Sequence, residues 1–146
     1  MAIRTYKAEV NSEGGLRCRA AARGFEVLMD EPKAHGGGDS AMTPLELLLS
    51  SLGGCMAITA KAHARRLGVS VAGCRVTIEG DLDPDGFMLK RDDVRTGFQE
   101  IRVTMQVSGD VPEEKLQELT ELVERACPVS DSLRGVDIVA HATRDT

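Results

Sequence analysis

Two cysteines occupy positions where a thiol can react, and both lie in segments with helical character. Cys55 follows Gly53-Gly54 inside a long apolar run, and those two positions without side chains leave space beside its sulfur. Cys127 closes the apolar stripe of a second helical segment and precedes Pro128. If this stripe packs on the first helix, the two sulfurs meet in one cleft and form a redox pair. Two unconnected core cysteines are the alternative interpretation.

The remaining residue types that carry chemistry form no recognisable site. Cys18 and Cys74 fall in predicted strands, where a cysteine is usually a small apolar filler. The sequence has no Cys-x-x-Cys pair and no histidine at zinc-finger spacing, so we expect no structural zinc site. The run 36–38 of three glycines lacks the Lys and Ser or Thr that follow in a phosphate-binding loop, and we interpret it as a flexible lead-in to the helix.

The composition is typical of one soluble globular domain. Of 146 residues, 42% are hydrophobic and 28% are charged, and the formal net charge is −5. An acidic chain has no global field that attracts nucleic acid or anionic lipid, and an aromatic content of 3% leaves few platforms for base stacking. We therefore expect a single domain over residues 1–146 that binds neither nucleic acid nor a membrane.

The location predicted from the sequence is the cytoplasm. The segment from Met1 to Val10 carries charged residues and lacks the apolar core of a signal peptide. The longest uncharged apolar stretch runs from Leu47 to Ala60, which is shorter than the roughly 18–20 residues that a membrane span needs. In the cytoplasm thiols stay reduced, and a disulfide is usually transient and part of a reaction.

The elements around the two cysteines are predicted in the order βββ-α-ββ-α-β, an α+β pattern. Alternating apolar and polar residues predict six strands. They cover residues 5–10, 16–22, 25–29, 74–79, 101–107 and 136–143. A polar loop over 81–97 separates the fourth strand from the fifth, and an amphipathic helix starts near Pro112. Cys127 is expected to be the N-cap of a short turn over 128–133, where a helix N-terminus would lower its pKa.

The first helix has the clearest signals for its two ends. Thr43 is a good N-cap, Pro44 suits the first helical position, and Glu46 completes a capping box. Cationic residues and then Gly68 end the helix. Apolar residues cover nearly its whole circumference, which predicts a helix that is buried on all sides.

Two segments of the sequence resemble the cysteine motifs of the OsmC/Ohr family, named for osmotically induced protein C and organic hydroperoxide resistance protein. The first, Met42–Cys55, reads MTPLELLLSSLGGC and follows Gly37-Gly38-Asp39; the second, Glu124–Ser130, reads ERACPVS. The predicted order of elements is similar to that of the family over essentially the whole chain. The resemblance implies an intertwined homodimer, in which antiparallel sheets surround buried central helices and the active sites lie at the subunit interface.

The resemblance also implies a thiol-dependent peroxidase, an antioxidant oxidoreductase of the oxidative stress response that reduces organic hydroperoxides to alcohols. Cys55 matches the peroxidatic position and Cys127 the resolving one. The implied Cys55–Cys127 disulfide is reduced by an external dithiol, and neither a metal nor a bound organic cofactor is required. In relatives an arginine near the end of the first strand activates the thiolate; Arg17 is the best match here and Arg19 the second.

One position departs from the hydroperoxide-resistance branch and favours a more divergent OsmC-like branch. That branch has a glutamate directly after the proline of the helix start, whereas this chain has Leu45 and then Glu46. Glu46 already belongs to the capping box, and it lies nine positions before Cys55, about half a turn out of phase. Glu46, Leu52 and Met56 are candidate substrate contacts. The alternative function is a non-catalytic dimeric module that binds a small apolar molecule or senses oxidation.

Overall fold

The computed structural model describes residues 2–145. The chain divides between Leu48 and Leu49 into two compact units. The long helix α1, Pro44–His63, begins in the first unit and continues into the second. The α+β class, the two small sheets and the long helix agree with the predicted fold. The expectation that residues 1–146 form a single domain stays a prediction.

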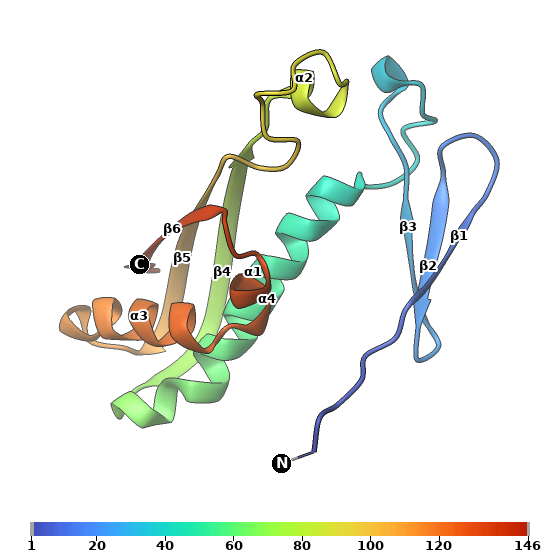
Figure 1. The fold of residues 1–146 in the computed structure, drawn as a ribbon. Coiled ribbons are helices and arrows are strands. Elements are labelled where there is room, and N and C mark those ends of the chain that lie inside the picture. The colour runs from blue at the N-terminus through green and yellow to red at the C-terminus, as the bar shows by residue number, and fades with distance from the viewer. Residues whose placement is uncertain (1, 146) are drawn as a thin grey trace. The chain divides into compact units, whose positions relative to one another are not determined.

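The first unit is built on an antiparallel sheet of three strands in the order β1-β2-β3 (Figure 1, blue). Its elements are β1 Glu9–Ser12, β2 Cys18–Ala22, β3 Phe25–Met29 and the 3-10 turn η1 Lys33–His35. The predicted strand over 5–10 is wrong in position, because β2 is too short to pair with it. Glu9 already faces Ala21, one residue before the end of β2, so the residues before Ala8 extend past the end of that strand.

A buried carboxylate fixes the loop between β3 and α1. Asp30, which is 3% exposed, accepts hydrogen bonds from the backbone N–H of Glu31, Gly38 and Ser40 and from the Ser40 hydroxyl, which lies 2.7 Å away. These donors, the Ser40 hydroxyl foremost, lower the pKa of Asp30 to about 2. A Cβ at Gly37 would lie 1.9 Å from the Glu31 carbonyl oxygen. The glycine run is therefore a close-packed turn rather than the flexible lead-in that we expected.

The predicted ends of α1 are confirmed. The Thr43 amide donates to Glu46 Oε2 at 2.8 Å, and the Glu46 amide donates to Thr43 Oγ1 at 3.1 Å, which is the reciprocal pair of a capping box. After His63 the chain makes one 3-10 turn, η2 Ala64–Leu67, and stops at Gly68 with a φ of 70°. Only glycine adopts this left-handed conformation without strain.

The second unit is a three-stranded sheet with helices packed on it. Its strands are β4 Ser70–Asp81, β5 Glu100–Asp110 and β6 Asp137–Arg144. Besides η2 and most of α1, its helices are α2 Pro84–Phe87, η3 Glu113–Lys115, α3 Leu116–Ala126 and α4 Pro128–Ser132. β4 pairs with β5 in antiparallel fashion, but β6 runs parallel to β5, which differs from the wholly antiparallel sheets that we expected. The chain crosses over from β5 to β6 through α3 and α4, as a parallel pair requires.

The core of the second unit lies between the sheet and one face of α1. The central strand β5 contributes Ile101, Val103 and Met105, each at most 2% exposed. From α1, Leu52 and Met56 are fully buried. Helix α3 contacts β6 and turns its predicted apolar stripe into the same core, where Leu119 and Val123 are fully buried. Figure 1 shows α3 (orange) beside the sheet. The amphipathic prediction for this helix is therefore confirmed.

Helix α1 differs from its prediction, because only one of its faces is covered within the second unit. Leu52, Met56 and Ala60 are fully buried, whereas Ile58 is 70% exposed. Among the described residues, 44–67 form the one helix that is long and apolar enough to cross a membrane. Because its buried face packs in the core of the second unit, we assign it as a core helix rather than a span.

The loop between β4 and β5 is ordered, although its sequence indicated only turns. Asp83 caps α2 by accepting a hydrogen bond from the Asp85 amide at 3.0 Å. A Cβ at Gly86 would lie 2.6 Å from the Arg95 carbonyl oxygen, so this glycine permits close approach of the two backbones. The Arg95 guanidinium in turn donates to the carbonyl of Gly135, just before β6. The loop is thereby attached to the segment that follows α4.

Candidate functional site: a facing pair of thiols

The structure brings two distant cysteines of the second unit into contact. Cys127 Sγ lies 3.1 Å from Cys55 Sγ, although the two residues are 72 positions apart. Both cysteines are free thiols, and the gap between their sulfurs exceeds the roughly 2.05 Å of a disulfide bond. This distance confirms the sequence-based expectation that the two sulfurs lie together.

The chain turns sharply at Cys127, and this turn aims the thiol. Cys127 ends α3 in an extended conformation, with φ −79° and ψ 110°, because Pro128 cannot continue a helix. Pro128 instead occupies the first position of α4, and Cys127 Sγ accepts a hydrogen bond from the Ser130 amide at 3.5 Å. The predicted N-cap is confirmed.

The two sulfurs have different surroundings. Cys127 is 1% exposed and Cys55 is half-buried. Burial raises the pKa of Cys127, and this effect outweighs the opposing hydrogen bond from the Ser130 amide. Our expectation that a helix N-terminus lowers the pKa of Cys127 is therefore wrong. The five-residue helix α4 is too short to offset the loss of hydration.

The two glycines before Cys55 have separate roles. A Cβ at Gly53 would lie 2.8 Å from Ile78 Cδ1, so the absent side chain at Gly53 allows α1 to pack closely on β4. A Cβ at Gly54 would meet nothing within 4 Å, and Gly54 is exposed. Gly54 therefore leaves open space on the surface of α1, and the space that the sequence predicted beside the Cys55 sulfur stays a prediction. The Cys55 carbonyl also accepts a hydrogen bond from Thr59 Oγ1 at 2.7 Å, within the same helix.

The candidate substrate contacts lie in three different environments. Leu52 and Met56 are fully buried in the core of the second unit. Glu46 is exposed at the start of α1 and is engaged in the capping box with Thr43. Leu45, which stands where the hydroperoxide-resistance branch has its acid, is 42% exposed. Substrate binding by Glu46, Leu52 and Met56 stays a prediction.

Both candidate activating arginines make ion pairs with one acid of the first unit. Arg17 Nε lies 2.8 Å from Glu13 Oε2, and Arg19 Nε lies 2.7 Å from Glu13 Oε1. Arg19 also reaches Glu26 at 3.0 Å. A hydrogen bond from Arg19 is the main cause of a lowered pKa of Glu13. Sequence reasoning missed Glu13, although an acid four residues before Arg17 across a turn was a usable signal. Thiolate activation by Arg17 or Arg19 stays a prediction.

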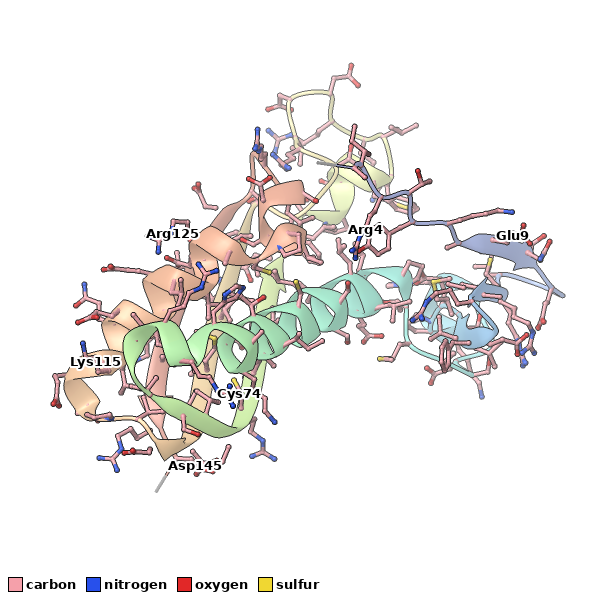
Figure 2. The ribbon with its side chains drawn as sticks, turned by 90° about the horizontal axis from the view of Figure 1, so that it is seen from below. Arg4, Glu9, Cys74, Lys115, Arg125 and Asp145 are labelled. Carbon is pink, nitrogen blue, oxygen red and sulfur yellow. The ribbon has the colours of Figure 1, made fainter. Side chains whose placement is uncertain are left out.

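Cys74 is a half-buried thiol on β4 (Figure 2). Burial raises the pKa of Cys74, and the nearby Lys61 ammonium partly opposes this effect. Cys18 lies on β2 of the first unit, so both cysteines stand in strands as predicted. Among residues 2–145, no three His, Cys, Asp or Glu side chains gather so that they could hold a metal ion.

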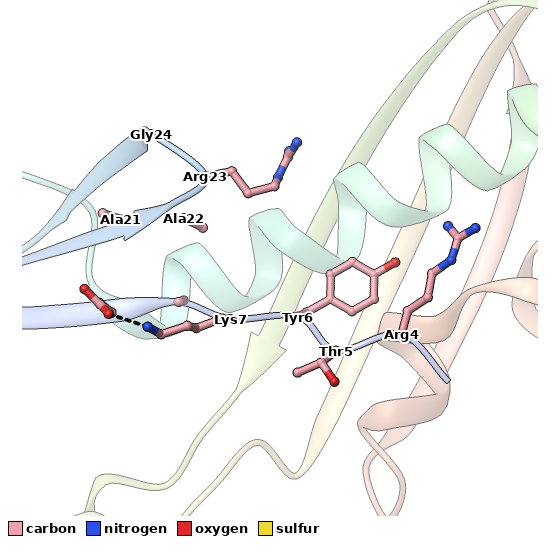
Figure 3. A pocket seen from close by; sticks show the side chains of 10 residues that line it. Arg4, Thr5, Tyr6, Lys7, Ala21, Ala22, Arg23 and Gly24 are labelled. Atoms are coloured by element: carbon pink, nitrogen blue, oxygen red, sulfur yellow. Dashed lines mark ion pairs between the residues drawn. The ribbon is translucent and has the colours of Figure 1, made fainter. Parts of the chain in front are cut away.

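The first unit has a surface basin of about 1100 Å³ that neither Cys55 nor Cys127 lines. Its walls are the segment 4–9 and the turn 21–24 between β2 and β3 (Figure 3). Arg4, Lys7 and Arg23 give it a cationic character, but Lys7 is paired with Glu9 at 2.6 Å. Tyr6 is 90% exposed, so the basin is open rather than enclosed.

An apolar helix that presents one thiol to a second thiol at the end of an amphipathic helix defines a dithiol protein of the α+β class. A family model described as OsmC-like protein matches residues 36–140, which include both cysteines. The chain belongs to the OsmC family. No protein of curated function matches the sequence.

Solved structures share the fold at low sequence identity. The crystal structure of an OsmC-like protein from Mycoplasma pneumoniae has a TM-score of 0.81 and 21% identity, over 98% of this chain and 99% of that one. An organic hydroperoxide resistance protein from Legionella pneumophila has a TM-score of 0.74 and 20% identity, over 98% and 99%. An OsmC-like protein of unknown function from Vibrio cholerae has a TM-score of 0.80 and 13% identity, over 97% and 100%. At such identities the similarity shows the fold alone.

Proposed function

We propose that this protein is a thiol-dependent peroxidase that reduces organic hydroperoxides to alcohols. The observation that carries the proposal is the 3.1 Å contact between Cys55 Sγ and Cys127 Sγ. A thiol that is oxidised beside a second thiol forms a disulfide instead of proceeding to irreversible acids. Membership of a family that includes hydroperoxide-resistance proteins supports the same function.

The proposed reaction has three balanced steps. The Cys55 thiolate attacks the terminal oxygen of the hydroperoxide, the O–O bond breaks, and the alkoxide takes a proton to leave as an alcohol. Cys127 then attacks the sulfur of the Cys55 sulfenic acid, and its thiol proton leaves with the hydroxyl group as water. An external dithiol finally reduces the Cys55–Cys127 disulfide by exchange and is itself oxidised to a disulfide.

The assignment of roles follows from exposure. Cys55 is half-buried and Cys127 is buried, so the Cys55 sulfur is the more accessible of the two to a hydroperoxide. Cys127 is 1% exposed and is therefore suited to the internal, resolving step. We further propose that Arg17 stabilises the Cys55 thiolate, with Arg19 as the alternative. Leu52, Met56 and Glu46 stay proposed substrate contacts, the first two as the apolar base of the site.

We also propose that the protein is a homodimer that works in the cytoplasm. The uncovered face of α1 supports a dimer, because it exposes Ile58 to 70% on a helix whose composition is typical of a protein interior. A second copy of the same chain is the proposed cover. The four free cysteines fit a reducing compartment.

Consumption of hydroperoxide in the presence of a dithiol tests the proposed function. The wild type is expected to consume cumene, tert-butyl or fatty-acid hydroperoxide, whereas Cys55→Ser is expected to be inert. Cys74→Ser is the matched control, because it removes a half-buried thiol outside the pair, and it should retain activity. After one equivalent of hydroperoxide, the intact mass should fall by two hydrogen atoms only when Cys55 and Cys127 are both present.

Equal inertness of the wild type and Cys55→Ser towards all three hydroperoxides would refute the peroxidase. If the disulfide nevertheless formed rapidly, a redox sensor would be the function. If it did not form, a binding module would remain, which the exposed apolar Leu45 at the start of α1 favours.

A further inference from the structure

The hydrogen bonds around Cys127 Sγ show where its proton is directed. On one side the Ser130 amide donates to this sulfur at 3.5 Å. On the other side Cys55 Sγ lies at 3.1 Å, within reach of the S–H of Cys127. A thiol has one proton to donate and accepts only weakly through its lone pairs. With Ser130 as the donor to this sulfur, the Cys127 proton is available to Cys55.

The difference in burial assigns the charge to the other sulfur. Cys127 is 1% exposed and loses nearly all its hydration, whereas Cys55 is half-buried. A charge is less costly on the sulfur that keeps contact with water. The raised pKa of Cys127, caused first by burial, agrees with a thiol that keeps its proton.

We propose that Cys127 acts before it resolves any intermediate, as a hydrogen-bond donor whose S–H stabilises the Cys55 thiolate. The proposal rests on the proposed function for its role in catalysis, because Cys55 is the nucleophile there. Cys127 thereby serves two successive steps with one proton. It first shares the proton with the Cys55 thiolate, and it later gives that proton up when it attacks the sulfenic acid and water leaves.

Two substitutions of similar size separate this donor from the resolving function. Cys127→Ser keeps a donor in its hydroxyl group and an acceptor for the Ser130 amide. Cys127→Ala removes both. Neither variant can form the disulfide, so any difference between them reports on the hydrogen bond and not on resolution.

The measurement is the pH dependence of Cys55 alkylation by iodoacetamide, followed by mass spectrometry on the peptide that contains Cys55. We expect the midpoint for Cys127→Ala to lie about one pH unit above that for Cys127→Ser, which is about tenfold less thiolate at low pH. The limiting rate at high pH serves as an internal control. A merely structural role of Cys127 changes access and therefore the limiting rate, but it leaves the midpoint in place.

Equal midpoints for the two variants, or a lower midpoint for Cys127→Ala, would overturn the proposal. Thermal unfolding shows whether each variant is folded; if Cys127→Ala is not, Cys127→Val provides the same comparison with a larger side chain that leaves no cavity and has no donor. Alkylation requires no hydroperoxide. A wild type without peroxidase activity would therefore refute the proposed function, while the order of midpoints still decides the donor role. Equal midpoints would in turn refute the donor role and leave the proposed function standing.

Discussion

Gly53 provides the sharpest test of how α1 is held against β4. In Gly53→Ala the new Cβ would lie 2.8 Å from Ile78 Cδ1, so either the end of the Ile78 side chain or α1 itself must shift. Alanine gains about 1 kcal/mol of helix propensity over glycine. Overpacking typically costs about 1–3 kcal/mol. The expected net effect is a loss of up to about 2 kcal/mol in the free energy of unfolding.

The second half of this test removes the atom that the new methyl group meets. Ile78→Val deletes Cδ1 and alone should cost about 0.5–1.5 kcal/mol. The next contacts of a Cβ at Gly53 are 3.7 Å from Ile78 Cγ1 and Val76 Cβ, which is ordinary van der Waals distance. The double variant should therefore be at least as stable as Ile78→Val, so that the two substitutions couple favourably by about 1 kcal/mol or more.

Urea unfolding of the wild type, the two single variants and the double variant gives this coupling energy directly. The rate of disulfide formation after one equivalent of hydroperoxide is a second readout, because a displaced α1 moves Cys55 away from Cys127. That rate should fall in Gly53→Ala and recover in the double variant. Additive stabilities, within about 0.3–0.5 kcal/mol, would refute the reasoning, as would a double variant less stable than Ile78→Val.

Three further predictions concern other parts of the chain. Asp30 has a pKa of about 2 against an ordinary 3.8, so its contribution to stability is present above about pH 4 and is lost as the pH falls towards 2. In thermal unfolding, Asp30→Asn should therefore lose less stability than the wild type between pH 5 and pH 2. The same pH dependence in both proteins would contradict this. Thr43→Ala should cost about 1 kcal/mol by loss of the cap on α1, measured by urea unfolding, and an effect below about 0.3 kcal/mol would contradict the capping box. Ile58→Arg should convert a wild-type dimer to a folded monomer in sedimentation equilibrium; a wild-type monomer, or a variant that stays dimeric, would contradict the role proposed for the uncovered face of α1.

The sequence predicted most reliably those features that depend on a few adjacent residues. The capping box of α1, the stop at Gly68 and the N-cap at Cys127 each involve one turn of backbone, and all three are confirmed. The amphipathic helix α3 is confirmed for the same reason, since its apolar stripe repeats within eleven residues. Local hydrogen bonds and side-chain spacing decide such features wherever the segment lies in the fold.

Features that depend on pairing between distant segments were predicted less well. β1 begins at Glu9 instead of Thr5 because the length of β2 limits the ladder, and alternation within the segment carries no information on its partner. The parallel pairing of β6 depends on the crossover through α3 and α4, which is a matter of topology rather than of the strand's own residues. The uncovered face of α1 is also invisible to periodicity, because an apolar pattern does not say whether its own chain or another covers it.

The pKa of Cys127 shows why a correct local element can still lead to a wrong chemical prediction. The N-cap was predicted correctly, and the Ser130 amide does lower the pKa of this thiol. Burial acts in the opposite direction and is stronger, and it arises from packing that no local pattern encodes. A lowered pKa at a helix N-terminus would favour Cys127 as the first nucleophile, whereas its raised pKa does not. A thiol that resists ionisation is a poor first nucleophile but a good partner for one, because it keeps the proton that a neighbouring thiolate needs. The fold thus places a thiol of raised pKa against a more exposed thiol, and this asymmetry supports the proposed division between a peroxide-accepting sulfur and a resolving one.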